Sequence, residues 1–587
     1  MIKTLLKSVR EYKLVSIFTP ILMVGEAVME IIIPFFMTFI VGELERVSKS
    51  LDVQAAVDGK IIAIYASAMV ASALLALLFG VLGAKFAAKA SCGFAHNLRE
   101  DMYNNLQTFS FANIDNYSTS SLITRITTDV NNVQMAYQMA LRMLVRAPIL
   151  FISSIIMTVI IEPYMALIFG GAATVLGILI VIGMVKVVPY FKTMFRKYDG
   201  LNSVVQENLT AIRVVKSYVR DDRENAKMRQ ASEDVYHYSV KAERILTVMM
   251  PAVTLVLFIC NIIILTVGSN MFVGNIAGNV SPTQIQTLIQ YSAQILSGVM
   301  MAAMCLNFIS LSKGSADRIC EVLNETTTLP KPAQPVFEVK DGSIVFNDVD
   351  FCYSQKADVM VLKDITIRIN SGETVGIIGA TGSGKTSLVS LIPRLYDVAQ
   401  GSVEVGGVDV RNYNLDALRN GVAMVLQKNV LFSGTIAENL RWGDENATDE
   451  DLQLACRQAC AEEFIERLPG KYEYDLGQGG VNVSGGQKQR LCIARAMLKK
   501  PKVIIFDDST SAVDTKTDAQ IRAALRQHAP ETTKIIIAQR IASVQDADKI
   551  IVLDDGRING VGTHEELIKT NEIYREVYES QVHGGEE

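Results

Sequence analysis

Apolar residues are concentrated in the first 312 positions of the chain, where they form long runs with few charges. From Ile245 to Ser312, 68 consecutive residues include no Asp, Glu, Lys or Arg. One helix crosses a bilayer in about 20 residues, so this stretch must hold two spans, with the polar segment Gly268–Pro282 as the loop between them. Four further runs each fit one span: Leu14–Ile40, Ile61–Ala84, Met143–Ile161 and Tyr164–Val185. The pattern predicts six transmembrane helices.

Basic residues near the ends of the spans predict the orientation of the chain. Lys3, Lys7, Arg10 and Lys13 precede the first span, whereas the loop after that span is mildly acidic. Lys and Arg accumulate on the cytoplasmic side of membrane proteins, so we expect both termini in the cytoplasm. The first apolar run is too long for a signal peptide and lacks a clear cleavage site. We therefore expect a multi-pass protein of the cell membrane, with a bacterial inner membrane favoured.

Two long charged stretches, about Lys85–Arg142 and Lys186–Arg244, separate the second span from the third and the fourth from the fifth. They keep helical patterns, so they are either soluble loops or cytosolic extensions of the spans. A linker with three prolines follows over 326–336. The expected organisation is a transmembrane domain over 1–325, this linker, and a water-soluble α/β domain over 337–587.

A phosphate-binding motif lies near the start of the α/β half. The motif GxxxxGK[ST] follows a strand-like run, Thr374–Ile378, and precedes a predicted helix. The glycines let backbone N–H groups surround phosphates, and the helix N-terminus favours their negative charge. Lys is expected to reach the β- and γ-phosphates and Thr the Mg²⁺. The predicted ATP-binding residues of this segment are Gly379, Ala380, Thr381, Gly382, Ser383, Gly384, Lys385, Thr386 and Ser387.

A second apolar run, Val503–Phe506, is typical of a buried strand and ends in Asp507. An acid at the carboxyl end of such a strand, facing a phosphate-binding loop, is where Mg²⁺ coordination is expected. Without the loop, Asp507 would be read as an ordinary turn residue.

Further motifs make the chain resemble the ATP-binding cassette (ABC) superfamily. Ser484, Gly485, Gly486 and Gln487 stand in a run, Val483 to Arg490, that looks like the family's signature sequence. Gln427 resembles its Q-loop glutamine, Asp514 its D-loop aspartate, and Tyr353 the aromatic residue that stacks on adenine. Six spans fused ahead of one cassette resemble a half-transporter of the multidrug and lipid exporter type.

The resemblance implies a fold and an activity. The fold class is an all-α domain of six membrane helices fused to an α/β P-loop nucleotide-binding domain, the ABC cassette. The implied function is ATP-driven export of amphipathic small molecules by alternating access, with ATP and Mg²⁺ as cofactors. Thr386, Gln427 and, through water, Asp507 are the implied Mg²⁺ ligands. Short coupling helices near Phe111–Asn116 and Asn208–Arg213 are expected to dock on the cassette.

Two positions differ from the family's usual catalytic set. Asp508 replaces the Glu that activates water, and its carboxylate lies one methylene closer to the backbone. A misplacement of ~1 Å can reduce a rate ~10²-fold. Gln539 replaces the switch histidine, and an amide cannot carry a proton.

Both replacements weaken the same step, so we expect this site to hold ATP and to hydrolyse it slowly. The chain would then supply its signature to a second, homologous half-transporter. A homodimer in which the two changes are neutral is the alternative.

Two sets of membrane residues are candidates for substrate contact. Glu26 and Glu30 share one face of the first span; they form either a cation-attracting cavity or a structural pair with a neighbouring helix. In the last span, Gln290 and Met301 are candidates because Met suits adaptable surfaces, although it also serves ordinary packing.

Composition and charge exclude some other classes. The net charge of −5 gives no electrostatic footprint for nucleic acid. The eight cysteines include no CxxC pair and histidines are few, so unligated thiols are expected. Two other functions share these motifs: an ATP-gated channel or regulatory membrane protein, and an importer built on the exporter fold.

Overall fold

The computed structural model describes residues 1–49, 58–274, 280–353, 359–508 and 515–583. The chain divides into two compact units. The membrane unit comprises Met1–Gln107 and Thr119–Glu325, and the cassette unit comprises Thr108–Ser118 and Thr326–Glu587. The segment Thr108–Ser118 therefore belongs to the cassette unit, although membrane helices flank it in the sequence.

Within the described part of the membrane unit, six helices are long and apolar enough to cross a membrane, as the sequence predicts. They are α2 (Lys13–Lys49), α3 (Gly59–Gln107), α6 (Val130–Ile161), α7 (Pro163–Thr210), α9 (Asp221–Gly274) and α10 (Pro282–Asn324). Shorter helical segments are α1 (Ile2–Lys7), η1 (Arg10–Tyr12), α5 (Thr119–Thr124), η2 (Arg125–Asp129) and α8 (Ile212–Ser217).

Local sequence explains where two of the long helices begin. Pro163 opens α7, at a position where the missing N–H has no helical partner to lose. Ser281 caps α10: its side chain accepts from the Gln284 N–H, and the Gln284 side chain bonds back to the Ser281 backbone.

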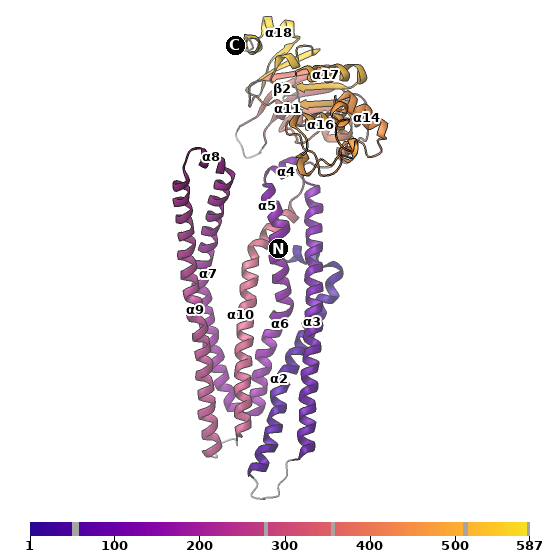
Figure 1. Ribbon diagram of the computed structural model, residues 1–587. Coiled ribbons are helices and arrows are strands. Elements are labelled where there is room, and N and C mark those ends of the chain that lie inside the picture. Colours follow the sequence, from indigo (N-terminus) through magenta and orange to yellow (C-terminus); the bar gives the residue numbers. More distant parts are fainter. Residues whose placement is uncertain (50–57, 275–279, 354–358, 509–514, 584–587) are drawn as a thin grey trace. The chain divides into compact units, whose positions relative to one another are not determined.

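The membrane helices form two groups (Figure 1). Helices α7 and α9 run side by side, while α2, α3, α6 and α10 contact one another, and α10 also touches α9. The charged stretch after the second span lies largely within α3 and α6, and the stretch after the fourth span lies largely within α7 and α9. They are helical extensions of the spans rather than irregular loops.

The cassette unit contains two sheets. A four-stranded antiparallel sheet has the order β2-β1-β4-β5, and a six-stranded sheet has the order β10-β9-β3-β8-β7-β6. The strands are β1 (Ile344–Phe351), β2 (Leu362–Ile369), β3 (Thr374–Gly379), β4 (Gln400–Val405), β5 (Val408–Asp409), β6 (Val422–Val425), β7 (Val503–Asp507), β8 (Thr533–Ile537), β9 (Lys549–Asp554) and β10 (Arg557–Gly562).

In the larger sheet, β9, β3, β8, β7 and β6 are parallel. Helices cover such sheets on both faces, which explains the uninterrupted apolar runs of β3, β7 and β8. Because these three strands are parallel neighbours, the loops after Gly379, Asp507 and Ile537 meet at one edge.

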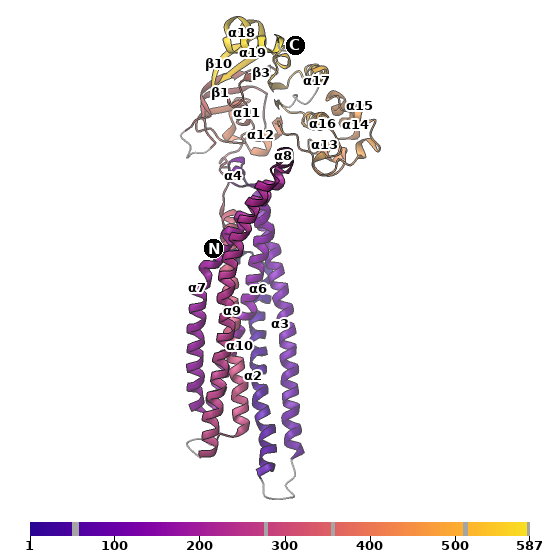
Figure 2. The ribbon, with the colours of Figure 1, turned by 60° about the vertical axis from the view of Figure 1, so that its left-hand side comes forward.

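Helices surround these sheets, and α13, α14, α15 and α16 gather at one end of the unit (Figure 2). The helices are α4 (Phe111–Asp115), α11 (Lys385–Ser390), α12 (Leu415–Gly421), α13 (Ile436–Arg441), α14 (Asp449–Gln458), α15 (Glu462–Ile465), α16 (Gly485–Leu498), α17 (Thr515–His528), α18 (His564–Thr570) and α19 (Glu572–His583). Single turns are η3 (Val410–Asn412), η4 (Lys471–Glu473), η5 (Gln478–Gly480) and η6 (Ile541–Ser543).

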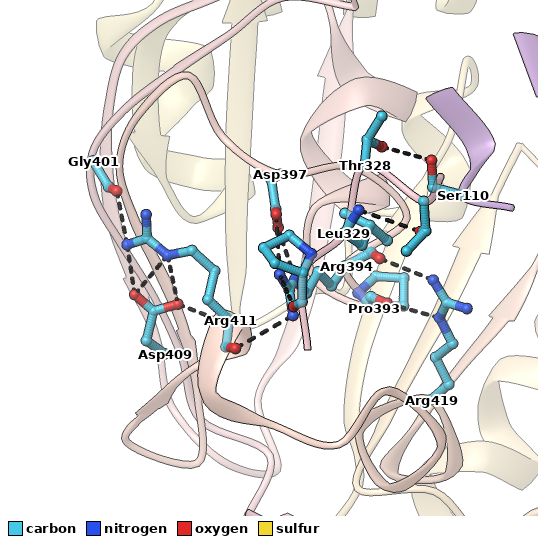
Figure 3. Close-up of polar contacts among 12 residues, drawn as sticks. Ser110, Thr328, Leu329, Pro393, Arg394, Asp397, Gly401, Asp409, Arg411 and Arg419 are labelled. Carbon is cyan, nitrogen blue, oxygen red and sulfur yellow. Dashed lines mark hydrogen bonds and ion pairs between the residues drawn. The ribbon is translucent and has the colours of Figure 1, made fainter. Parts of the chain in front are cut away.

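A buried arginine fixes the linker to the cassette (Figure 3). Arg394 is 1% exposed and pairs with Asp397 over 2.7 Å. Its other guanidinium nitrogens donate to the carbonyl of Pro330 in the linker, at 3.2 Å, and to that of Arg411, at 3.3 Å. A buried guanidinium needs such partners, so this arginine holds three segments together.

Candidate nucleotide-binding site

The phosphate-binding loop connects β3 to α11, as the motif predicts. Gly384, the residue before α11, has φ +95°, a conformation that disfavours other residues. A Cβ at Gly379 would stand 2.2 Å from the carbonyl oxygen of Leu553 on β9. Both glycines are therefore required by the backbone path of the loop.

Lys385 lies across this loop. Its ammonium donates to the carbonyl of Gly379 at 2.8 Å and to that of Ala380 at 2.7 Å. Burial lowers the pKa of Lys385, and the nearby carboxylates of Asp508 and Asp507 oppose this effect. The Ser383 hydroxyl accepts a third, longer hydrogen bond at 3.4 Å. A partly buried cation whose hydrogen-bond partners are neutral oxygens is well placed to bind an anion such as a phosphate.

Thr386 and Asp507 are in direct contact. The Thr386 hydroxyl, on α11, donates to the Asp507 carboxylate at the end of β7 over 2.8 Å. Asp507 is 3% exposed, and burial raises its pKa. Two oxygen groups this close fit a hard cation, so the residues present match the Mg²⁺ that the motifs imply.

The three predicted catalytic residues, Asp508, Gln539 and Gln427, are joined by hydrogen bonds to Asp508. Its carboxylate oxygen Oδ2 accepts a hydrogen bond from Gln539 Nε2 at 2.7 Å and from Gln427 Nε2 at 3.2 Å. Asp508 has φ +47°, and its backbone N–H donates to the carbonyl of Ile537. The three side chains follow β6, β7 and β8, which explains how residues far apart in sequence converge.

Tyr353 follows β1 and is 46% exposed. Its hydroxyl is hydrogen-bonded to that of Ser387 on α11 over 2.8 Å. The ring packs edge-on against Phe351 and Tyr396, at centroid distances of 4.9 and 5.1 Å. The ring is thus held beside the phosphate-binding helix with a face open to a ligand.

The signature residues lie elsewhere, at the start of α16. Ser484 caps this helix: its hydroxyl accepts from the Gln487 N–H, and the Gln487 side chain accepts from the Ser484 N–H at 2.8 Å. The side chain of Ser484 therefore bonds to its own helix and not to the phosphate-binding loop. Asp514, the predicted D-loop residue, lies outside the described residues.

The membrane candidates separate into two locations. Arg146 on α6 pairs with Glu26 over 3.1 Å and with Glu30 over 2.7 Å, which matches the structural alternative for these carboxylates. Met301 lines a cavity of about 950 Å³ in the membrane unit. Gln290 is exposed on α10 and is not among the residues that line this cavity.

Sequence reasoning missed Tyr396, which touches both Tyr353 and the segment of α4. No local pattern marks this tyrosine, because its partners are distant in sequence. Short helices lie at or beside the two segments expected to couple the halves. Helix α4 covers Phe111–Asp115, whereas Asn208–Thr210 end α7 and the short helix α8 begins only at Ile212.

Comparisons with known proteins agree with the motifs. The family described as the ABC transporter transmembrane region matches residues 16–300, and the family described as ABC transporter matches residues 362–511. The uncharacterized ABC transporter ATP-binding protein YfiB of Bacillus subtilis (strain 168) is 32% identical over 98% of both chains. The probable multidrug resistance ABC transporter ATP-binding/permease protein YheI of the same organism is 32% identical over 82% of each.

A solved structure, that of a bacterial Atm1-family ABC exporter with ATP bound, superposes with a TM-score of 0.81. It covers 96% of this chain and 98% of its own, at 23% sequence identity. The likeness establishes that the two proteins share a fold.

Proposed function

Because the chain belongs to the ABC transporter family, with an exporter-type membrane domain fused to its ATP-binding cassette, we propose that it is the slowly hydrolysing subunit of a heterodimeric exporter. In this proposal Tyr353, the phosphate-binding loop (379–387) and Lys385 bind ATP. Thr386, Gln427 and, through water, Asp507 would hold Mg²⁺, which would neutralise phosphate charge.

The hydrogen bond from Gln539 to Asp508 carries this proposal. A water-activating base needs an oxygen directed at the water, whereas two amides already donate to Asp508 Oδ2 and orient this carboxylate toward Gln539 and Gln427. Neither amide can remove a proton from the site. The ATP-binding groups, by contrast, retain their usual residue types, so binding is kept while hydrolysis is slowed.

The signature segment is assigned to the partner's site. Ser484 and the N–H groups at the start of α16 form an anion-binding helix terminus with no acidic residue in the first turn. A partner chain with Glu and His at the positions of Asp508 and Gln539 would provide the hydrolytic site. ATP binding would close the paired cassettes and turn the membrane cavity outward, and hydrolysis would reset it.

The cavity in the membrane unit supports an amphipathic substrate. Its lining includes seven methionines: Met143, Met184, Met249, Met250, Met300, Met301 and Met304. Methionine adapts to differently shaped apolar ligands. Lys192, Arg196 and Asp199 also line the cavity and supply polar contacts. We place the protein in a bacterial inner membrane with both termini and the cassette in the cytoplasm.

Two substitutions test the asymmetry in the complex purified from its own membranes. Asp508→Ala should change ATP turnover by less than about twofold, whereas Ser484→Arg should abolish it, because it blocks the partner's site. Equal losses from both substitutions would contradict the proposal. A native mass of twice the chain's own mass, with only this chain present, would do so as well.

A further inference from the structure

One tyrosine of the cassette unit, Tyr396, contacts both α4 and the residue expected to stack on adenine. The Tyr396 hydroxyl donates to the Asp115 carboxylate on α4 over 2.6 Å. The Tyr396 ring packs edge-on against Phe111, also on α4, at 6.1 Å between centroids. On its other side the same ring meets Tyr353 at 5.1 Å, with an interplanar angle of 88°.

A second connection joins this tyrosine to the phosphate side of the site. Helix α11, which begins at Lys385, leads directly into the turn Leu391–Asp397. Within that turn the Leu395 N–H donates to the carbonyl of Ser390, the last residue of α11. Tyr396 therefore touches the adenine end of the site through Tyr353 and is connected to the phosphate end through α11.

Other hydrogen bonds from the α4 segment lead, through the linker, to the same turn, Leu391–Asp397. Ser110 is hydrogen-bonded to Thr328 over 2.6 Å (Figure 3), and the side-chain amide of Asn113 donates to the carbonyl of Thr326. These linker residues are close to Pro330, whose carbonyl accepts from Arg394 in the turn. Movement of this turn must therefore move α4 or break these bonds.

We infer that Tyr396 is a positioning residue that transmits ATP occupancy of this chain's own site to the membrane helices through α4. Adenine stacked on Tyr353 presses on the ring of Tyr396, and phosphate bound at Lys385 fixes the start of α11. Both effects fix the turn that holds Asp115. Since α4 lies in the chain between α3 and the short segments α5 and η2, which lead into α6, its position is passed to the membrane helices α3 and α6.

This inference rests on the proposed function and assigns a regulatory role to the slowly hydrolysing ATP site. A site that binds ATP without rapid hydrolysis stays occupied for many cycles. Its occupancy can then act as a steady signal, which α4 delivers without any turnover at this site.

The test uses the intact purified complex in lipid nanodiscs. Tyr396→Phe removes the hydroxyl but keeps the ring, and Asp115→Ala removes the acceptor from an exposed position. Tyr413→Phe is the matched control, because the Tyr413 hydroxyl also donates a hydrogen bond in the cassette unit, to the carbonyl of Val405, but has no partner on α4. Each variant also carries Phe195→Cys, at a residue that lines the membrane cavity.

Two quantities are measured: the affinity for a fluorescent ATP analogue, and the change that saturating MgATP makes in the rate of maleimide labelling at position 195, resolved by peptide mass spectrometry. We expect Tyr396→Phe and Asp115→Ala to keep the affinity within about twofold and to reduce the ATP-induced change by about threefold or more. The double variant should lose no more than either single one, because both remove the same bond.

A full ATP-induced change in either variant, or an equal loss in Tyr413→Phe, would overturn the inference. If the wild-type complex bound no ATP analogue at this chain's site, the proposed function itself would be wrong, and the relay with it. Asp115→Asn offers a rescue: its amide oxygen still accepts from Tyr396, so the response should return toward that of the wild type.

Discussion

The side-chain amide of Gln539 lies 2.7 Å from the carboxylate of Asp508 and donates a hydrogen bond to it. Both residues depart from the pattern of the family, and the structure shows that the two departures touch. A neutral acceptor such as histidine could receive a proton at this position, whereas glutamine only donates from its nitrogen. The hydrogen bond from Gln539 therefore holds the carboxylate of Asp508, the residue that would otherwise activate water.

Reversing both departures should restore hydrolysis. Asp508→Glu together with Gln539→His lengthens the base by one methylene and frees it from the amide. In a complex whose partner site has been inactivated, we expect ATP turnover to rise by about tenfold or more. Asp508→Gln with Gln539→His is the control, since it has the new histidine but no base. Equal turnover in the two double variants would refute the interpretation of Asp508.

Lys385→Met should abolish nucleotide binding without weakening the fold. Burial depresses the pKa of Lys385, so its charged form destabilises the folded cassette at every pH below that pKa. We expect an unfolding midpoint equal to or above that of the wild type without ligand, and no rise on adding MgATP. Lys363→Met, which removes an ion pair of β2 with Asp555, should keep the full MgATP response in the same thermal scan.

Arg146 should be essential for the stability of the membrane unit. Arg146→Met leaves the partly exposed Glu26 and Glu30 without their cation, and an unpaired carboxylate in a membrane-spanning helix is expected to reduce stability by about 3 kcal/mol. The measure is the fraction of monodisperse protein after detergent extraction and heating. Adding Glu26→Gln and Glu30→Gln should recover most of the loss. Arg142→Met, one turn earlier on α6, is the control.

Two arginines drawn in Figure 3 should differ in their effect on the cassette. Arg394→Met leaves Asp397 and two carbonyl groups without their hydrogen-bond donor. We therefore expect the free energy of unfolding of the cassette to fall by about 3 kcal/mol. Arg411→Met removes a more exposed ion pair with Asp409 and should change the free energy of unfolding by less than about 1 kcal/mol. Equal shifts in a urea titration would show that burial does not decide the effect.

The cysteines of the cassette core should resist alkylation. Burial raises the pKa of Cys456 to about 12 and raises that of Cys492 as well, so both stay protonated near pH 8. Because the neutral thiol is favoured in the folded state, these cysteines make their full contribution to stability below the ordinary thiol pKa of 9.0. That contribution is lost as the pH rises toward the pKa of the folded state. Iodoacetamide should modify the exposed Cys92 at least about ten times faster than either, as resolved by peptide mass spectrometry.

Features set by local sequence could be predicted from the residues alone, whereas contacts across the fold could be expected only in outline, from the family resemblance or as one of two alternatives. The six spans and the phosphate-binding loop each follow from a continuous stretch, since span length and the glycine motif are local properties. The hydrogen bond between Thr386 and Asp507 joins residues 121 positions apart and depends on the strand order β3-β8-β7. The pairing of Arg146 with both glutamates likewise required the packing of α2 against α6.

The attachment of α4 has a consequence for how the chain is made. Asp115 leaves the ribosome 281 positions before Tyr396, a delay of roughly 15 to 55 s at ordinary rates of synthesis. Phe111 and Ile114, still partly exposed when α4 is seated, have no cassette to contact in that interval. A chain that stalls before its last third keeps this apolar turn uncovered, where chaperones and proteases recognise unfinished proteins. Seating of α4 thus requires a chain that has been made at least as far as Tyr396.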